Sequence, residues 1–136
     1  MLLVDTNVLV DLLEDDPRWA DWSLRQLRAQ AQVHQLFINP VIYAELSLIF
    51  DSVKELDEAI EGIGLRIEEM PRPALFLAGR AFLKYRRARG TRTNVLADFF
   101  IGAHASVLGC GILTRDGRRY RNYFPRVPLV TPDEAP

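Results

Sequence analysis

The chain begins with the stretch Met-Leu-Leu-Val-Asp-Thr-Asn at residues 1–7, and the expectation for the whole fold starts from these residues. The short apolar run from Leu2 to Val4, bounded by polar residues, predicts a buried strand. Asp5 ends that run, and the apolar segment from Val8 to Leu13 predicts a helix soon after it. The opening therefore predicts a strand, a carboxylate at the carboxyl end of the strand, and a helix.

The same unit recurs along the chain. Further strands are predicted at residues 36–38, 65–67, 111–114 and 129–130, and further helices at residues 18–32, 41–50, 52–63, 73–89 and 94–108. Asp51 or Ser52 is expected to cap the helix that ends near Ile63, Asn94 the helix that ends at Leu108, and Gly90 follows the helix at 73–89. Short strands alternating with helices are typical of a parallel sheet. We therefore expect one α/β domain over residues 1–136, with a central parallel sheet flanked by helices on both faces.

Composition narrows the class of protein. The 136 residues are 49% hydrophobic and 26% charged, which suits one globular domain. The single cysteine, Cys110, excludes an internal disulfide and favours a cytoplasmic location. Because the chain has no apolar stretch long enough to span a bilayer, we expect no membrane partner.

Charge is distributed unevenly. Residues 1–70 hold 14 acidic and 5 basic side chains, whereas residues 71–132 hold 12 basic and 2 acidic ones. A basic half predicts a polyanionic partner, although two solvated faces of opposite charge would give the same counts. The side chains expected to contact a phosphate backbone are Arg80, Lys84 and Arg87, spaced as one stripe on the helix at 73–89, and Arg115, Arg118 and Arg119.

Four isolated carboxylates suggest a metal site. Asp5 and Asp116 follow predicted strands, and the carboxyl ends of parallel strands usually border the ligand crevice. Glu45 is the only charge between Asn39 and Phe50, and Asp98 is the only charge between Thr93 and Leu108. A carboxylate on an apolar helix face is costly unless it is paired, and neither helix supplies a lysine or arginine. Hard oxygen ligands select Mg²⁺ or Mn²⁺.

Each carboxylate also has a simpler explanation. Asp5 fits the N-cap of the following helix, and Asp116 fits a turn before Gly117. Glu45 or Asp98 could pair with an arginine from elsewhere in the chain. The coincidence of all four favours a shared site over four separate explanations. The two histidines are not spaced as a catalytic pair, so an acid–base ribonuclease mechanism without a metal is not expected.

Several stretches in this order resemble the PIN-domain family. They are Leu-Val-Asp-Thr-Asn at 3–7, the lone Glu45 in an apolar helix, Leu-Ala-Asp-Phe-Phe-Ile at 96–101, and Leu-Thr-Arg-Asp at 113–116. The stretch at 115–125 is similar to that of the VapC-type toxins of bacterial toxin–antitoxin pairs. The resemblance covers nearly the whole chain.

The resemblance implies a metal-dependent endoribonuclease. In this interpretation Asp5, Glu45, Asp98 and Asp116 are catalytic, and the ion, Mg²⁺ or Mn²⁺, binds to the three aspartates. The substrate is single-stranded RNA, and cleavage leaves 5′-phosphate and 3′-hydroxyl ends. The resemblance further implies auxiliary residues near the metal, which are Thr6, Asn7 and Thr114. It also implies a VapB-like antitoxin as partner, and a homodimer.

Aromatic side chains are candidates for contacts. Trp19 and Trp22 lie off the apolar face of the helix at 18–32, so they either form part of an antitoxin or dimer surface or are buried by a wide apolar face. Tyr120, Tyr123 and Phe124 either stack on bases or pack in the core, and core packing is expected for at least two of them.

Competing families fit less well. A haloacid-dehalogenase-like phosphatase needs a second acid two residues after Asp5, where this chain has Asn7. A response-regulator receiver needs a lysine after a late strand, but the only lysines are Lys54 and Lys84. A non-catalytic nucleic-acid-binding module explains the basic half but not the isolated carboxylates. A PIN-domain nuclease that processes RNA and is not a toxin remains an alternative.

Overall fold

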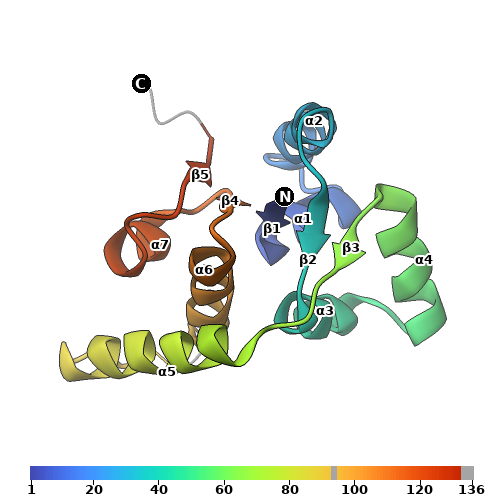
Figure 1. Cartoon of the computed structure of the whole chain (residues 1–136). Helices are drawn as coiled ribbons and strands as arrows, with labels where there is room; N and C mark the ends of the chain where they lie inside the picture. The colour runs from blue at the N-terminus through green and yellow to red at the C-terminus, as the bar shows by residue number, and fades with distance from the viewer. Residues whose placement is uncertain (93–94, 133–136) are drawn as a thin grey trace.

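The computed structural model of the chain describes residues 1–92 and 95–132 (Figure 1). Five strands form its sheet: β1 (Leu2–Val4), β2 (Leu36–Ile38), β3 (Arg66–Ile67), β4 (Gly111–Leu113) and β5 (Leu129–Val130). The helices are α1 (Thr6–Leu13), α2 (Ala20–Ala31), α3 (Pro40–Leu46), α4 (Val53–Ile63), α5 (Arg72–Arg87), α6 (Leu96–Leu108) and α7 (Arg118–Tyr123), with a 3₁₀ turn η1 (Ser47–Ile49).

The sheet confirms the predicted fold class. Its strand order is β3-β2-β1-β4-β5, and every pair of neighbouring strands is parallel. Leu3 of β1 is in register with Phe37 of β2 on one side and with Ile112 of β4 on the other. The chain moves outward from β1 to β3 and then returns to the opposite side of β1. Right-handed crossovers in these two directions place helices on opposite faces of the sheet.

This change of direction opens a crevice between β1 and β4. In open parallel sheets, ligands bind beyond the carboxyl ends of the strands where the strand order reverses. The backbone N–H of Asp5 donates to the carbonyl of Leu113 at 2.9 Å, so the ends of β1 and β4 are joined here. The topology therefore places the residues that follow these two strands, Asp5 and Thr114, side by side.

Buried core residues lie beneath the crevice. Leu3, Phe37 and Ile112 are fully buried in the sheet, and Phe99 and Ile101 of α6 are also fully buried. Helix α6 contacts α3, α5, α7 and β4, and Figure 1 shows it running from α5 toward the sheet. In the described part of the chain, no helix is both long and apolar enough to cross a membrane.

Helix ends follow the expected capping chemistry. The side chain of Asn39 accepts a hydrogen bond from the N–H of Ile42, and Pro40 stands in the first turn of α3. Ser52, and not Asp51, caps α4. Gly64 ends α4 at a φ of +86°, which glycine adopts without strain. The predicted cap of α6, Asn94, lies outside the described residues.

Two sequence expectations need correction. The predicted helix at 41–50 ends as an α-helix at Leu46 and tightens into η1, where Leu48 is 85% exposed. Leu48 therefore does not lie on a buried face, although Leu46 is buried and Phe50 packs against the core. The sequence pattern also does not predict α7, because the segment is rich in arginine and has little apolar periodicity. Only Tyr120 within α7 and Phe124 just after it are buried against the core.

Candidate active site

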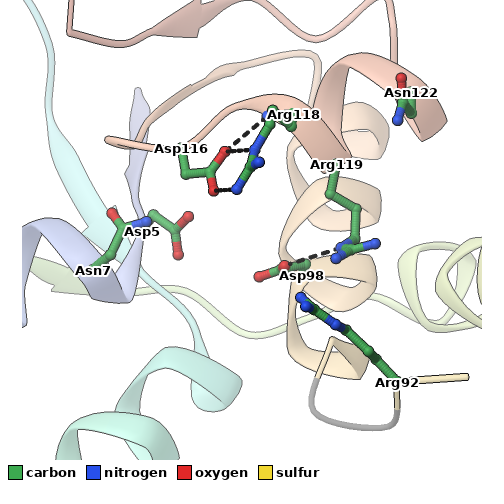
Figure 2. Close-up of a pocket in the computed structure, with 8 residues that line it drawn as sticks. All are labelled: Asp5, Asn7, Arg92, Asp98, Asp116, Arg118, Arg119 and Asn122. Atoms are coloured by element: carbon green, nitrogen blue, oxygen red, sulfur yellow. Dashed lines mark hydrogen bonds and ion pairs between the residues drawn. The ribbon is translucent and has the colours of Figure 1, made fainter.

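A pocket lies at the carboxyl edge of the sheet, and three of the four predicted acids line it (Figure 2). Asp5 ends β1, Asp98 stands in the first turn of α6, and Asp116 lies between β4 and α7. The other lining residues are Asn7, Arg92, Arg118, Arg119 and Asn122. The pocket therefore joins acidic and basic side chains that are far apart in sequence.

Asp5 is the buried carboxylate of this pocket, at 5% exposure. Its Oδ1 accepts the backbone N–H of Thr6 at 2.7 Å, and its Oδ2 accepts the hydroxyls of Thr114 and Tyr120, each at 2.8 Å. These three donors are electrically neutral. Burial, together with the nearby charge of Asp98, raises the pKa of Asp5 to about 7. Asp5 is also the N-cap of α1, so its capping role and a place in the pocket are both real.

Asp98 is paired with an arginine from another helix. The Nε of Arg119, in α7, lies 3.4 Å from the Oδ2 of Asp98. Burial nevertheless raises the pKa of Asp98, with smaller contributions from the charges of Glu45 and Asp116, and Arg119 only opposes the rise. The simpler explanation considered for Asp98, an ion pair with an arginine from elsewhere in the chain, is therefore present in the structure. The pair does not fully offset the cost of placing the carboxylate here.

Compared with Asp98, the side chain of Asp116 is held more firmly and is more exposed to solvent. Its oxygens accept hydrogen bonds from the Arg118 guanidinium at 3.0 and 2.8 Å, and its side chain is 44% exposed. The hydrogen bonds from Arg118 lower the pKa of Asp116, so it is ionised at neutral pH. The backbone N–H of Arg118 also donates to Asp116 at 3.2 Å, which is the turn role considered for this residue.

Glu45 stands beside the pocket. Its Oε1 accepts the hydroxyl of Thr6 at 2.5 Å, which ties α3 to the start of α1. Its charge contributes to the raised pKa of Asp98. Glu45 also lines a neighbouring apolar hollow with Leu96 and Phe100.

The three auxiliary residues organise the carboxylates. Thr114 donates to Asp5, and Thr6 donates to Glu45. The side chain of Asn7 donates to Thr114 Oγ1 and accepts the backbone N–H of Arg115, both at 3.2 Å. Asn7 therefore joins α1 to the segment after β4 and lines the pocket, while Asp5 is the residue that caps α1.

The predicted basic residues divide into three groups. Arg118 and Arg119 line the pocket. The α5 stripe of Arg80, Lys84 and Arg87 is exposed. Arg115 makes two contacts with Asp11, one of 3.2 Å from its Nη2, and its guanidinium lies 5.7 Å from the ring centre of Trp19.

Sequence reasoning missed three residues of the pocket region. Arg92 and Asn122 line the pocket, and Tyr120 holds Asp5 from below. Arg92 lies in a short connection with no motif, and the sequence does not predict α7. The position of Tyr120, four residues after Asp116 and so one helical turn away, is the one signal that could have found it.

The structure decides part of the aromatic alternatives. Tyr120 and Phe124 are buried, so core packing of at least two residues of that group is confirmed. Trp19 and Trp22 pack edge to face with ring centres 6.1 Å apart, and Trp22 also packs against the core. His104 is fully buried and contacts Asn39 at 3.2 Å, consistent with no catalytic role.

The chemistry of the pocket fits a divalent cation. Asp5, Asp98 and Asp116 offer hard oxygen donors, and the raised pKa of Asp5 is what an added positive charge would reverse. Within residues 1–92 and 95–132, no three acidic, histidine or cysteine side chains are arranged to hold one ion in these conformations. Arg118 and Arg119 already hold Asp116 and Asp98, so an ion would have to compete with them.

The fold and the pocket define a small α/β protein with a pocket, lined by three carboxylates and three arginines, at the point where the strand order of a parallel sheet reverses. A family model, the PIN domain, matches residues 2–125, and the chain therefore belongs to the PIN-domain family. PIN domains are generally nucleases and generally use divalent metals. The comparison with curated protein sequences finds no match.

Solved structures share this fold. One is VapBC2 from Rickettsia felis, bound to a DNA fragment from the VapBC2 promoter. It is 18% identical, with a TM-score of 0.74, and the match covers 97% of this chain and 98% of that chain. FitAcB from Neisseria gonorrhoeae is 22% identical, with a TM-score of 0.65 over 95% and 96%. A toxin–antitoxin complex from Klebsiella pneumoniae is 21% identical, with a TM-score of 0.68 over 98% and 99%.

Proposed function

We propose that this protein is a Mg²⁺- or Mn²⁺-dependent endoribonuclease and the toxin of a VapBC-type pair. The observation that carries the proposal is the convergence of Asp5, Asp98 and Asp116 on one pocket that arginines also line. Carboxylates suit a metal ion, and arginines suit the phosphates of the substrate. The proposal assigns this activity to one domain over residues 1–136, in the cytoplasm, as the lone Cys110 favours.

In this proposal Asp5, Asp98 and Asp116 hold the ion, and Glu45 completes the acidic cluster. When bound, the ion supplies a water of lowered pKa and neutralises charge on the phosphate. Thr114 and Tyr120 fix the orientation of the Asp5 carboxylate through its Oδ2. The products are 5′-phosphate and 3′-hydroxyl ends.

Basic side chains place the substrate. Arg118 and Arg119 lie beside the acids, where they bind a phosphate of the substrate. The exposed α5 stripe of Arg80, Lys84 and Arg87 extends the basic surface for the RNA backbone. Arg115 belongs to the same proposed surface, and its contacts with Asp11 give it a structural role as well.

The proposed partners are a VapB-like antitoxin and a second copy of the chain. The solved structures that share the fold include toxin–antitoxin assemblies, which supports an antitoxin for this chain. The edge-to-face pair Trp19 and Trp22 remains a candidate for either surface.

The test is cleavage of single-stranded RNA by purified protein with Mg²⁺, with Mn²⁺ and with chelator. We expect cleavage with either ion, none with chelator, and loss of at least about 100-fold in Asp5→Asn. Equal cleavage by the wild type and Asp5→Asn would rule out the assigned site. Binding of RNA without cleavage under all conditions would favour the non-catalytic module. Growth arrest on expression, relieved by co-expressing a small neighbouring gene, separates a toxin from an RNA-processing enzyme.

A further inference from the structure

The basic side of the pocket is built on one aromatic side chain, Tyr85 of α5. Tyr85 is 9% exposed. Its ring packs against Phe82, Phe99 and Tyr123, with centre-to-centre distances of 5.9, 5.5 and 6.2 Å. Since aromatic pairs at these distances attract one another, the three neighbours fix the plane of the Tyr85 ring.

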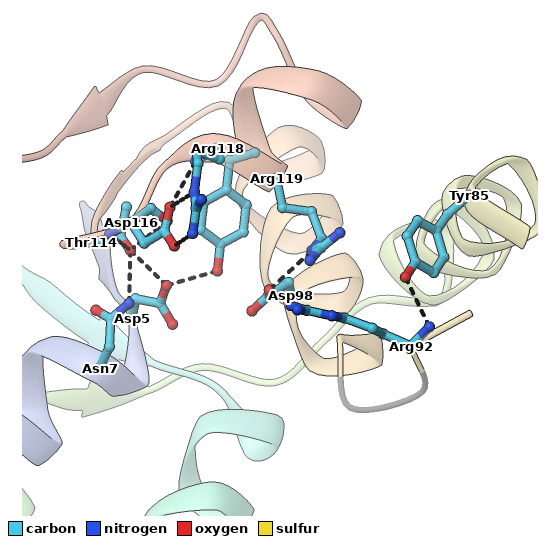
Figure 3. Close-up of polar contacts among 10 residues, drawn as sticks. Asp5, Asn7, Tyr85, Arg92, Asp98, Thr114, Asp116, Arg118 and Arg119 are labelled. Carbon is cyan, nitrogen blue, oxygen red and sulfur yellow. Dashed lines mark hydrogen bonds and ion pairs between the residues drawn. The ribbon is translucent and has the colours of Figure 1, made fainter. Parts of the chain in front are cut away.

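Two arginines of the pocket meet Tyr85 in different ways. The guanidinium carbon of Arg119 lies 5.3 Å from the centre of the Tyr85 ring, within the range of a cation–π contact. The Tyr85 hydroxyl accepts the backbone N–H of Arg92 at 3.1 Å. Figure 3 shows the side chains of Arg92 and Arg119 pointing toward Asp98 from separate segments. One side chain therefore contacts the guanidinium of Arg119 and the backbone of Arg92.

The segment before Arg92 is shaped to reach Tyr85. The backbone N–H of Gly90 donates to the carbonyl of Tyr85 at 2.9 Å. A Cβ atom on Gly90 would overlap the Tyr85 ring, so a larger residue here would displace the ring or the backbone. Glycine thus allows the chain that leaves α5 to fold back over the ring and carry Arg92 to the pocket.

We propose that Tyr85 is a positioning residue that sets Arg92 and Arg119 as a pair of phosphate-binding groups on the pocket wall. This rests on the proposed function, and the ligand is a phosphodiester group of single-stranded RNA. Guanidinium groups bind phosphate oxygens with two parallel hydrogen bonds, so their orientation matters. A guanidinium already oriented by an aromatic ring loses less conformational freedom when the phosphate binds. In the free protein Arg119 contacts Asp98, and the RNA phosphate competes for the same group.

The experiment compares Tyr85→Leu and Tyr85→Phe with the control Phe50→Leu. Phe50 is a partly buried aromatic residue that packs against the core, and it lies outside the lining of this pocket. The measurements are KM and kcat on a labelled RNA oligonucleotide with Mg²⁺, and binding of that oligonucleotide in chelator over a range of salt concentrations. Melting temperatures monitor folding.

Tyr85→Leu is expected to raise KM about ten-fold, to change kcat by less than about two-fold, and to weaken binding in chelator. The slope of log affinity against log salt should fall by roughly 0.7 for each phosphate that the variant no longer binds. Tyr85→Phe keeps the ring and removes only the bond to Arg92, so it should raise KM about two- to three-fold. When Arg92→Gln is already present, adding Tyr85→Phe should have no further effect on the slope of log affinity against log salt. Phe50→Leu should melt lower but keep the KM of the wild type and its slope of log affinity against log salt.

A wild-type KM and salt slope in Tyr85→Leu would overturn the proposal, and so would an equal change in Phe50→Leu. If Tyr85→Leu does not fold, the additivity of Tyr85→Phe with Arg92→Gln decides the matter, because full additivity also contradicts it. A wild-type protein that binds RNA but never cleaves it would contradict the proposed catalysis alone. A wild type that does not bind RNA would overturn both.

Discussion

The hydroxyl of Tyr120 donates a 2.8 Å hydrogen bond to the Oδ2 of Asp5, although 115 residues separate them in the chain. Tyr120 is 1% exposed and anchors α7, while Asp5 ends the first strand of the sheet. This bond lowers the pKa of Asp5 and so opposes the effect of burial. The position of α7 therefore helps to set the charge of the buried carboxylate in the pocket.

Tyr120→Phe is expected to move the acidic limb of the cleavage pH profile to higher pH. The variant removes a bond worth about 1 kcal/mol, which corresponds to roughly 0.7 pH units. Asp5 would then hold its proton at a pH where the wild-type carboxylate is ionised. The measurement is kcat/KM against pH at one fixed Mg²⁺ concentration below saturation, where the proton on Asp5 still competes with the ion. Tyr123→Phe is the matched control, since Tyr123 lies on the same helix and packs its ring on Phe99. An unshifted profile in Tyr120→Phe would contradict the prediction.

Asp5→Asn is expected to stabilise the metal-free protein near neutral pH. Because the folded pKa of Asp5 is raised from 3.8 to about 7, the folded protein binds a proton that the unfolded chain has released. The stability from this source is complete below pH 3.8 and is lost as pH rises toward 7. The full shift corresponds to on the order of 4 kcal/mol, at about 1.4 kcal/mol per unit.

The measurement is the free energy of unfolding of the wild type and Asp5→Asn in chelator, from about pH 4 to about pH 8. The variant should gain on the wild type as pH rises, and Mg²⁺ should narrow the gap because it stabilises only the folded wild type. A gap that is constant across this range would show that Asp5 titrates normally.

The sheet and the convergence of the acids were predictable because they depend on local patterns. Short apolar runs such as Leu36 to Ile38 mark buried strands, and a polar residue after a strand marks its carboxyl end. The strands observed at β2 and β5 match the predicted bounds. The ligand crevice at this edge then follows from the rule for open parallel sheets, whereas the strand order and register come from the structure.

The arginine partners were not predictable, because pairing between distant segments leaves no local pattern. Asp11 in α1 is a lone acid in an apolar helix, as Glu45 and Asp98 are. The structure places Asp11 outside the pocket lining and against Arg115. An isolated acid in an apolar segment therefore indicates a desolvation cost that a partner must offset. Only the fold decides whether that partner is an arginine or a ligand.

Arg115→Gln is expected to destabilise the protein by about 2 kcal/mol, because it leaves the 4%-exposed carboxylate of Asp11 without its partner. The value lies below that for fully buried pairs because Arg115 is 34% exposed. The double variant Asp11→Asn with Arg115→Gln should recover much of the stability. Arg118→Gln, at an 85%-exposed side chain, should reduce the salt dependence of RNA binding with little change in melting. The reverse pattern would make Arg115 chiefly an RNA-binding residue.

The variant Asp98→Asn distinguishes two roles for Asp98, that of a metal ligand and that of the ion-pair partner of Arg119. If the ion pair were the main role of Asp98, the variant would melt clearly lower and Mg²⁺ would have no effect on the difference. The raised pKa of Asp98 indicates the opposite, because burial and the charges of Glu45 and Asp116 outweigh the contact with Arg119. We therefore expect the metal-free variant to melt no lower than the metal-free wild type at neutral pH. Stabilisation by Mg²⁺ should largely disappear, and cleavage should fall at least about 100-fold.

The measurement is thermal melting of both proteins in chelator and in Mg²⁺, with RNA cleavage assayed on the same samples. Glu58→Gln is the control, because it removes an exposed carboxylate of α4 and should behave as the wild type. The sign again follows from linkage: a carboxyl whose folded pKa is raised destabilises the folded state once pH exceeds its unfolded pKa of 3.8. Removing that charge therefore relieves the metal-free protein and at the same time removes an oxygen ligand. A variant that melts much lower in chelator yet still cleaves RNA would assign Asp98 to the ion pair with Arg119.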